Sequence, residues 1–221
     1  MPEEGQSVTL DWMDTTALMS RVFAILTVVA NLSAVSAGVL MVLARFSSGA
    51  SDLLRSVRSW LSDYGLFLAW SVAIVSTLGS LFYSEIAGFT PCKLCWYQRI
   101  AMYPLVPILG IAAWKRDPGV WRYAVPVATI GAAISIYHYQ LERFPTQASV
   151  SCSAEAPCTV VWIWKFHFVS IPFMALSGFM LIIALLLVAR STARLDTDDV
   201  GATLAEHSGA IAGEDQRSAA R

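Results

Sequence analysis

The sequence predicts an all-α protein, built as a polytopic bundle of transmembrane helices. Of its 221 residues, 56% are hydrophobic and 14% are charged, and the mean hydropathy of +0.58 exceeds that of ordinary soluble domains. Five apolar runs approach the roughly 20 residues that a helix needs to cross a hydrocarbon core. They are residues 17–43, 65–82, 100–114, 123–139 and 168–189. The formal net charge of −1 gives no reason to expect nucleic acid as a partner.

The first two runs contain polar or small residues suited to helix packing. Residues 17–43 include Asn31, which we expect to hydrogen-bond to a neighbouring helix. Residues 65–82 include Gly79 and Ser80, whose small size lets another helix approach closely. Both runs are therefore expected to pack within a bundle.

The third run is the least regular. Residues 100–114 form a short run that contains Pro104 and Pro107, and we expect these prolines to kink the helix. The last two runs, 123–139 and 168–189, are long and apolar enough to be spans without such an interruption.

Lysine and arginine residues set the predicted orientation, because they are retained on the cytoplasmic side of a membrane. They gather between the first and second runs, between the third and fourth, and after the fifth: Arg45, Arg55, Arg58, Lys115, Arg116, Arg122, Arg190 and Arg194. The N-terminus is acidic instead. We therefore expect the N-terminus outside and the C-terminus in the cytoplasm. The alternative, a cleaved signal peptide, would need a basic rather than an acidic start.

This orientation places two cysteine pairs outside the membrane. Cys92 and Cys95 form a C-x-x-C motif, and Cys152 and Cys158 lie in the next outer loop. Exported cysteines are expected to pair as disulfides, because their compartment is oxidising. A zinc site and two inert structural disulfides are the alternatives, and the loose spacing of the second pair argues against zinc. We expect no metal here.

Helix physics favours a reactive first pair. Thr90 is a suitable N-cap and Pro91 suits the first helical position, so both cysteines are expected in the first turns of a helix. The N-terminus of a helix and nearby cations lower the pKa of a thiol. Arg99 follows Cys95 by four residues and shares its helical face.

The segment Cys92-Lys-Leu-Cys-Trp-Tyr-Gln-Arg99 resembles the signature of the DsbB family of disulfide-generating membrane proteins, in its short-loop BdbC-like branch. The order of the pairs agrees, whereas the vitamin K epoxide reductase family has its loop pair first. The resemblance implies a four-helix core, so residues 17–43 would be an extra N-terminal transmembrane helix. It divides the chain into an acidic extracytoplasmic N-terminus (1–16), the extra helix with a cytoplasmic loop (17–63), the DsbB-like core (64–190) and a disordered cytoplasmic tail (191–221).

The resemblance also implies an activity in the bacterial plasma (inner) membrane. A soluble, DsbA-type thioredoxin-like oxidase would be reoxidised by Cys152 and Cys158, and these would exchange with Cys92 and Cys95. The Cys95 thiolate would then deliver electrons to ubiquinone or menaquinone from the membrane pool. Arg99 and His138 match the family positions associated with the quinone.

Three other functions remain as alternatives. One is a quinone reductase of the vitamin K epoxide reductase type, and another is a non-catalytic membrane scaffold with structural disulfides. The third, a small-molecule transporter, is disfavoured because the spans lack the buried carboxylates or paired charges that such proteins often carry.

Overall fold

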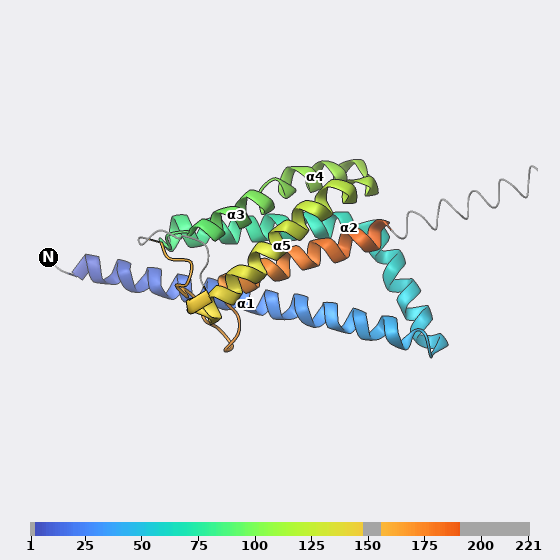
Figure 1. The fold of residues 1–221 in the computed structure, drawn as a ribbon, viewed down its shortest axis with the longest axis horizontal. Coiled ribbons are helices and arrows are strands. Elements are labelled where there is room, and N and C mark those ends of the chain that lie inside the picture. The colour runs from blue at the N-terminus through green and yellow to red at the C-terminus, as the bar shows by residue number, and fades with distance from the viewer. Residues whose placement is uncertain (1–2, 148–155, 191–221) are drawn as a thin grey trace, which may run out of the picture.

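The computed structural model describes residues 3–147 and 156–190, and these are almost wholly helical (Figure 1). The helices are α1 (Glu3–Leu43), α2 (Ser48–Leu81), the π-helix η1 (Phe82–Ile86), α3 (Lys93–Met102), α4 (Leu105–Lys115) and α5 (Trp121–Arg143), followed by Ile171–Arg190, which we call the C-terminal helix. Short 3-10 turns lie at Pro118–Val120 and Pro145–Gln147. Cys152 and the predicted tail 191–221 lie outside the described residues.

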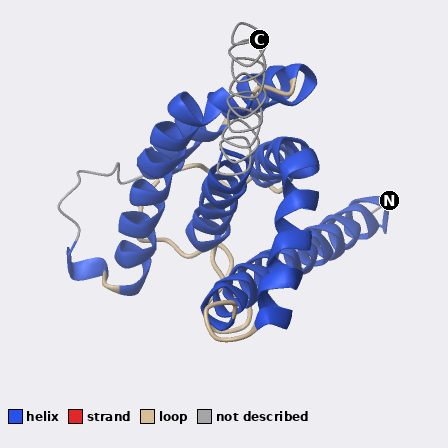
Figure 2. Cartoon of the chain, turned by 90° about the vertical axis from the view of Figure 1, so that its right-hand side faces the viewer, coloured by secondary structure: helices blue, strands red, loops and turns tan. Residues whose placement is uncertain are grey.

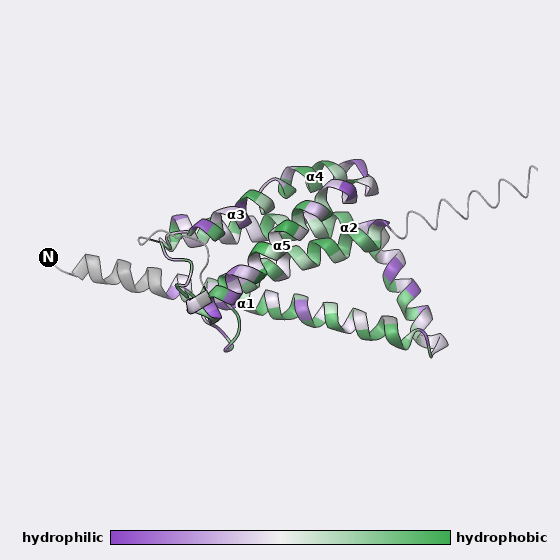
Figure 3. Ribbon diagram, in the orientation of Figure 1, coloured by the Kyte–Doolittle hydropathy of each residue, from purple (hydrophilic) through white to green (hydrophobic). Residues whose placement is uncertain are grey.

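The predicted all-α membrane bundle is confirmed. Four of the described helical segments are long and apolar enough to cross a membrane: Asp14–Leu40, Asp63–Ile86, Pro118–Arg143 and Ile171–Arg190. Hydrophilic residues gather toward the ends of the bundle, and apolar residues cover the helices between them (Figure 3). In the described ranges the β pairing is an isolated bridge between Lys165 and Val169, and Figure 2 shows helices and loops there.

The third predicted span, residues 100–114, is not one helix. The structure divides it into α3 and α4, which meet at Tyr103 and Pro104. Proline lacks the N–H that would continue the helical hydrogen bonds, and its ring crowds the preceding turn. The interruption expected from the prolines therefore lies at Tyr103 and Pro104, although both residues keep helical backbone angles. At about 1.5 Å per residue, α3 and α4 together still cover a membrane thickness.

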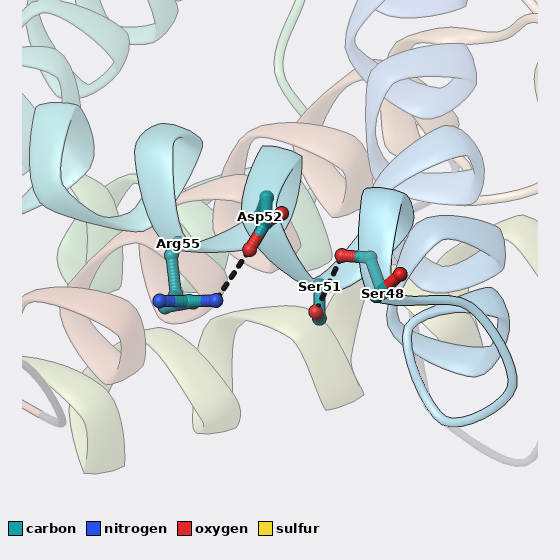
Figure 4. Close-up of polar contacts among 4 residues, drawn as sticks. All are labelled: Ser48, Ser51, Asp52 and Arg55. Atoms are coloured by element: carbon teal, nitrogen blue, oxygen red, sulfur yellow. Dashed lines mark hydrogen bonds and ion pairs between the residues drawn. The ribbon is translucent and has the colours of Figure 1, made fainter.

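The connection from α1 into α2 differs from a simple loop. Residues predicted to form the cytoplasmic loop are helical from Ser48 onward. The Ser51 hydroxyl donates to the Ser48 carbonyl at 2.6 Å, and Arg55 pairs with Asp52 (Figure 4). Both charged side chains are exposed, so this pair contributes at most about 0.5 kcal/mol. The first turns of α2 therefore form a helical approach to the bundle.

Small residues let the core helices pack closely. Ala69 and Ala73 on α2 and Ala128 on α5 are fully buried. A Cβ atom added at Gly131 would lie 2.3 Å from the ring of Phe179, which is itself fully buried. Close approach of this kind drives helix association where the lipid is as apolar as the side chains.

Candidate active site

The site lies where α2 ends and the chain turns into α3. The π-helix η1 ends at Ile86, and Gly88 follows with a φ of 70°, a left-handed conformation that glycine adopts without a steric penalty. The chain then reaches Cys92, which caps α3. The predicted N-cap, Thr90, is wrong by two residues, because the sulfur of Cys92 itself accepts the N–H of Cys95 at 3.4 Å.

Cys92 and Cys95 form a closely spaced dithiol. Both are free, and their sulfur atoms lie 3.2 Å apart. Cys92 is buried, with 5% of its surface exposed, and Cys95 is partly buried. The C-x-x-C spacing places the two sulfurs one turn apart at the start of a helix, where unpaired N–H groups favour negative charge.

His138 contacts this dithiol from α5. Its Nε2 atom lies 3.6 Å from Cys92 Sγ, and its Nδ1 atom lies 3.5 Å from Nε2 of the Gln98 side-chain amide. Only 3% of the His138 surface is exposed. His138 is therefore a partner of Cys92, held between the sulfur and the Gln98 amide.

The two thiols have opposed electrostatics. A hydrogen bond from Cys95 is the largest influence on Cys92, and, although burial opposes it, this bond together with His138 lowers the pKa of Cys92 to about 4. The hydrogen bond to Cys92, then burial and then the negative charge on Cys92 raise the pKa of Cys95, with Arg99 opposing. In the reduced dithiol, the thiolate therefore resides on Cys92 and the remaining proton on Cys95.

Arg99 is buried and tied to α2. Its Nε donates to the Ser80 hydroxyl and its Nη2 to the Ser80 carbonyl, both at 3.0 Å. The guanidinium also lies 5.3 Å from the centre of the Trp96 ring, within the range of a cation–π contact. With 9% of its surface exposed, Arg99 is a buried cation held in place by α2.

An apolar cavity of about 330 Å³ borders Cys95 and Arg99. On α2 its wall runs from Leu68 to Ser80, a length of about 18 Å at the helical rise of about 1.5 Å per residue. Its polar groups include Arg99, Gln98 and Ser80, whereas Leu68 and Val72 line the other end of the α2 wall. The volume lies within the range typical of ligand pockets.

His138 does not line this cavity. The structure thus separates the two residues predicted to bind a quinone, since Arg99 lies at the cavity and His138 lies against Cys92. A role for His138 at the quinone itself stays a prediction.

The second cysteine pair approaches the first through Cys158. This residue is disulfide-bonded and 2% exposed, and it belongs to one buried cluster with Cys92, Leu94 and Leu141. The Cys92–Cys95 dithiol therefore adjoins both Cys158, through Cys92, and the apolar cavity, through Cys95. Cys152 lies outside the described residues.

A stack of three aromatic rings joins the segments around the site. Phe89, just before the C-x-x-C motif, stacks on Tyr83 of η1 at 5.8 Å and on Trp162 at 4.9 Å between ring centres. Trp162 follows Cys158 by four residues, so the stack holds the two cysteine segments side by side. The sequence gives no signal for this arrangement, because Trp162 is far along the chain from Tyr83 and Phe89.

Cys92, Cys95 and His138 also provide the atoms of a potential metal site. The sulfurs of Cys92 and Cys95 and a His138 ring nitrogen lie within 4.8 Å of one another. Zinc binds such ligands, usually four of them or three with an open position. Three ligands from the described residues are thus available, although the sequence led us to expect no metal.

Fold and site together define a membrane-embedded helical protein with a redox-capable dithiol at one end of its bundle. A family model, "Disulfide bond formation protein DsbB", matches residues 62–189. The chain belongs to the DsbB family, and it is a membrane oxidoreductase of disulfide-bond formation. The family resemblance of the C-x-x-C segment is thereby confirmed.

Curated relatives from Bacillus are close in sequence. "Probable disulfide formation protein C 1" of Bacillus cereus (strain ATCC 10987 / NRS 248) is 50% identical over 121 residues, which are 54% of this chain and 87% of that protein. "Disulfide bond formation protein C" of Bacillus subtilis (strain 168) is 50% identical over 119 residues, 53% of this chain and 86% of that protein. No solved structure matches the chain.

Proposed function

We propose that this protein reoxidises a soluble thioredoxin-like thiol oxidase and passes the electrons to a membrane quinone. One observation supports this most: Cys92 packs in one buried cluster with the disulfide-bonded Cys158, and Cys95 lines the apolar cavity that also contains Arg99. Thiol-disulfide exchange requires such neighbouring pairs. The exchange end of the bundle would face outside the cytoplasmic membrane, as the lysine and arginine distribution predicts.

The cavity fits a quinone by its chemistry. Its apolar walls suit an isoprenoid tail, and Arg99 would donate a hydrogen bond to the polar head. When bound, ubiquinone or menaquinone would supply the acceptor for two electrons and two protons. Ser80 fixes the guanidinium by accepting from Nε and Nη2, and the remaining Nη N–H groups of Arg99 would orient the head.

The cysteines carry the exchange steps. A reduced partner gives two electrons and two protons to the Cys152–Cys158 disulfide, and that dithiol in turn reduces the Cys92–Cys95 disulfide, with Cys158 attacking Cys92. Each transfer passes through a mixed disulfide. The described arrangement, with Cys92 and Cys95 free and Cys158 bonded, corresponds to the state after this exchange.

The charge on Cys95 changes through the cycle. Its pKa is raised mainly by Cys92 in the reduced dithiol. When Cys92 is bonded to Cys158, it can no longer accept the hydrogen bond or carry the charge, and Arg99 then favours a Cys95 thiolate. The expected Cys95 thiolate therefore belongs to the mixed-disulfide state, and the Cys92 thiolate belongs to the reduced one.

Quinone reduction by the purified protein tests this function. The assay would supply a reduced DsbA-type partner with ubiquinone or menaquinone and follow the ultraviolet absorbance. We expect turnover in the wild type, loss of it in Cys95→Ala, and loss of it in Cys158→Ala. Wild-type protein that reduces neither quinone, while both cysteine pairs stay oxidised and resist mild reductant, would indicate structural disulfides instead.

A further inference from the structure

Helix α1 is an addition to the family core, yet it lines the cavity at the active site. The family match begins at residue 62, so all of α1 lies outside it. The B. cereus relative matches over 121 residues that are 87% of its length, and its remainder is shorter than the 41 residues of α1. Phe23, Leu26, Thr27 and Ala30 of this helix nevertheless border the cavity that contains Cys95 and Arg99.

One face of α1 is built for contact with the bundle. Ser20, Ala24 and Thr27 are 3%, 0% and 7% exposed, and their spacing of three to four residues places them on the same side of a helix. Ile25 and Val29, on the opposite side, are each 53% exposed. The helix therefore has one face toward the core and an apolar face toward lipid.

Two side chains, Phe23 and Asn31, hold the core-facing side of α1 against the bundle at the cavity. The ring of Phe23 lies only 3.0 Å from where a Cβ atom of Gly79 would be, and it packs on Tyr83 with ring centres 5.9 Å apart. The side-chain amide of Asn31 donates to the Ser177 hydroxyl of the C-terminal helix at 2.8 Å. The polar residue expected to hydrogen-bond to another helix does so, at the end of the α1 contact.

Beyond Asn31, α1 leaves the bundle. Val35, Val39 and Val42 are 64%, 53% and 59% exposed, and the helix diverges from the core toward Leu43 (Figure 1). Among the α1 residues whose burial is described, 14–40 and 42–43, burial is thus concentrated in the stretch from Ser20 to Asn31 that borders the cavity. A helix that served only to anchor the chain would need no such specific contact.

We propose that α1 forms the lipid-side wall of the site for the quinone tail, and that it sets the affinity for long-tailed quinones. This inference rests on the proposed quinone function. A quinone tail fits the shape of the cavity, whose α2 wall is about 18 Å long from Ser80, which holds Arg99, to Leu68. Phe23, Thr27 and Ala30 contact the tail, and the Asn31–Ser177 bond holds the wall closed.

Matched substitutions on neighbouring positions test the wall. Ala30→Phe places a ring in the cavity, whereas Val29→Phe places the same ring on the lipid-facing side. Asn31→Ala opens the wall without adding bulk. Quinone binding would be measured as thermal stabilisation of each full-length protein in detergent, using long-tailed menaquinone and ubiquinone and the tail-less counterpart of each. Exchange between the cysteine pairs would be followed separately, as a check on folding.

We expect Ala30→Phe and Asn31→Ala to weaken binding of the long-tailed quinone by about tenfold, or ~1.4 kcal/mol, with no change for the tail-less quinone. The Val29→Phe protein should bind the long-tailed and the tail-less quinone with the affinity of the wild type. Unchanged binding of the long-tailed quinone in both Ala30→Phe and Asn31→Ala would contradict the proposed wall. So would variants that lose co-purified lipid but keep the wild-type affinity for the long-tailed quinone. A wild type that binds and reduces no quinone would instead remove the proposed function, and the wall with it.

Discussion

The shared proton of the Cys92–Cys95 dithiol leads to a prediction that can be made quantitative. In the reduced protein, the hydrogen bond from Cys95 is the largest cause that lowers the pKa of Cys92, to about 4. A hydrogen bond to a charged group is worth about 1.5–3 kcal/mol, and one pKa unit corresponds to about 1.4 kcal/mol. Removing this donor by Cys95→Ala should therefore raise the pKa of Cys92 by about one to two units.

The assay is the rate of alkylation of Cys92 by iodoacetamide, measured by mass spectrometry as a function of pH. A thiol reacts as its thiolate, so the rate rises through the pKa and is flat above it. The wild-type rate should be flat from about pH 6 to 8, because the lowered pKa lies below this range. In Cys95→Ala the midpoint should move upward, and Cys95→Ser, which keeps a donor, should shift it less.

Other results of this alkylation assay would contradict the prediction. A wild-type midpoint near the ordinary cysteine pKa of about 8.5 would refute the electrostatic reasoning, and so would an identical midpoint in Cys95→Ala. Ser and Ala variants that shift together would show that burial, and not the hydrogen bond, controls the thiol.

Further predictions follow from other contacts. Arg99→Ala should raise the apparent KM for quinone more than it slows exchange between the cysteine pairs, and an unchanged KM in steady-state assays would remove Arg99 from the quinone site. Phe89→Ala should slow exchange and leave the KM for quinone unaltered, because Phe89 stacks on Trp162 at 4.9 Å beside the second pair; a stopped-flow exchange rate equal to wild type would contradict this. Gly131→Ala should destabilise the bundle by about 1–3 kcal/mol, since its Cβ would lie 2.3 Å from Phe179, and an unshifted thermal midpoint in detergent would disprove the close packing.

The helical spans could be predicted from sequence because lipid imposes a simple rule on length and polarity. The exception is instructive: hydropathy marks residues 100–114 as one run, but Pro104 divides it into α3 and α4. The prolines gave the position of the disturbance. Its extent could not be predicted, because Tyr103 and Pro104 keep helical backbone angles even though the helix is interrupted there.

The site was predictable as a set of residues and less so as an arrangement. The C-x-x-C motif and Arg99 were found from their spacing along one helix. The proximity of His138 to Cys92, and not to the cavity, depends on how α5 packs against α3. Local cap preferences favoured Thr90, but the sulfur of Cys92 satisfies the same N–H group.

The role of α1 was out of reach for a similar reason. Asn31 could be recognised as a hydrogen-bonding residue in an apolar run, whereas its partner Ser177 lies 146 residues away. Hydropathy identifies a helix that can span a membrane, but it carries no information on which cavity that helix covers.

The central claim is that the Cys92–Cys95 dithiol passes its electrons directly to a quinone, and a single-turnover experiment tests it most directly. Protein with this pair reduced and Cys158 still disulfide-bonded would be mixed anaerobically with quinone, without any soluble partner, and its thiols then counted by alkylation and mass spectrometry. We predict that one quinone is reduced for each cysteine pair oxidised, and that Cys92 and Cys95 become resistant to alkylation together. If both cysteines can still be alkylated completely after reaction with excess quinone, the Cys92–Cys95 dithiol is not the electron donor to quinone.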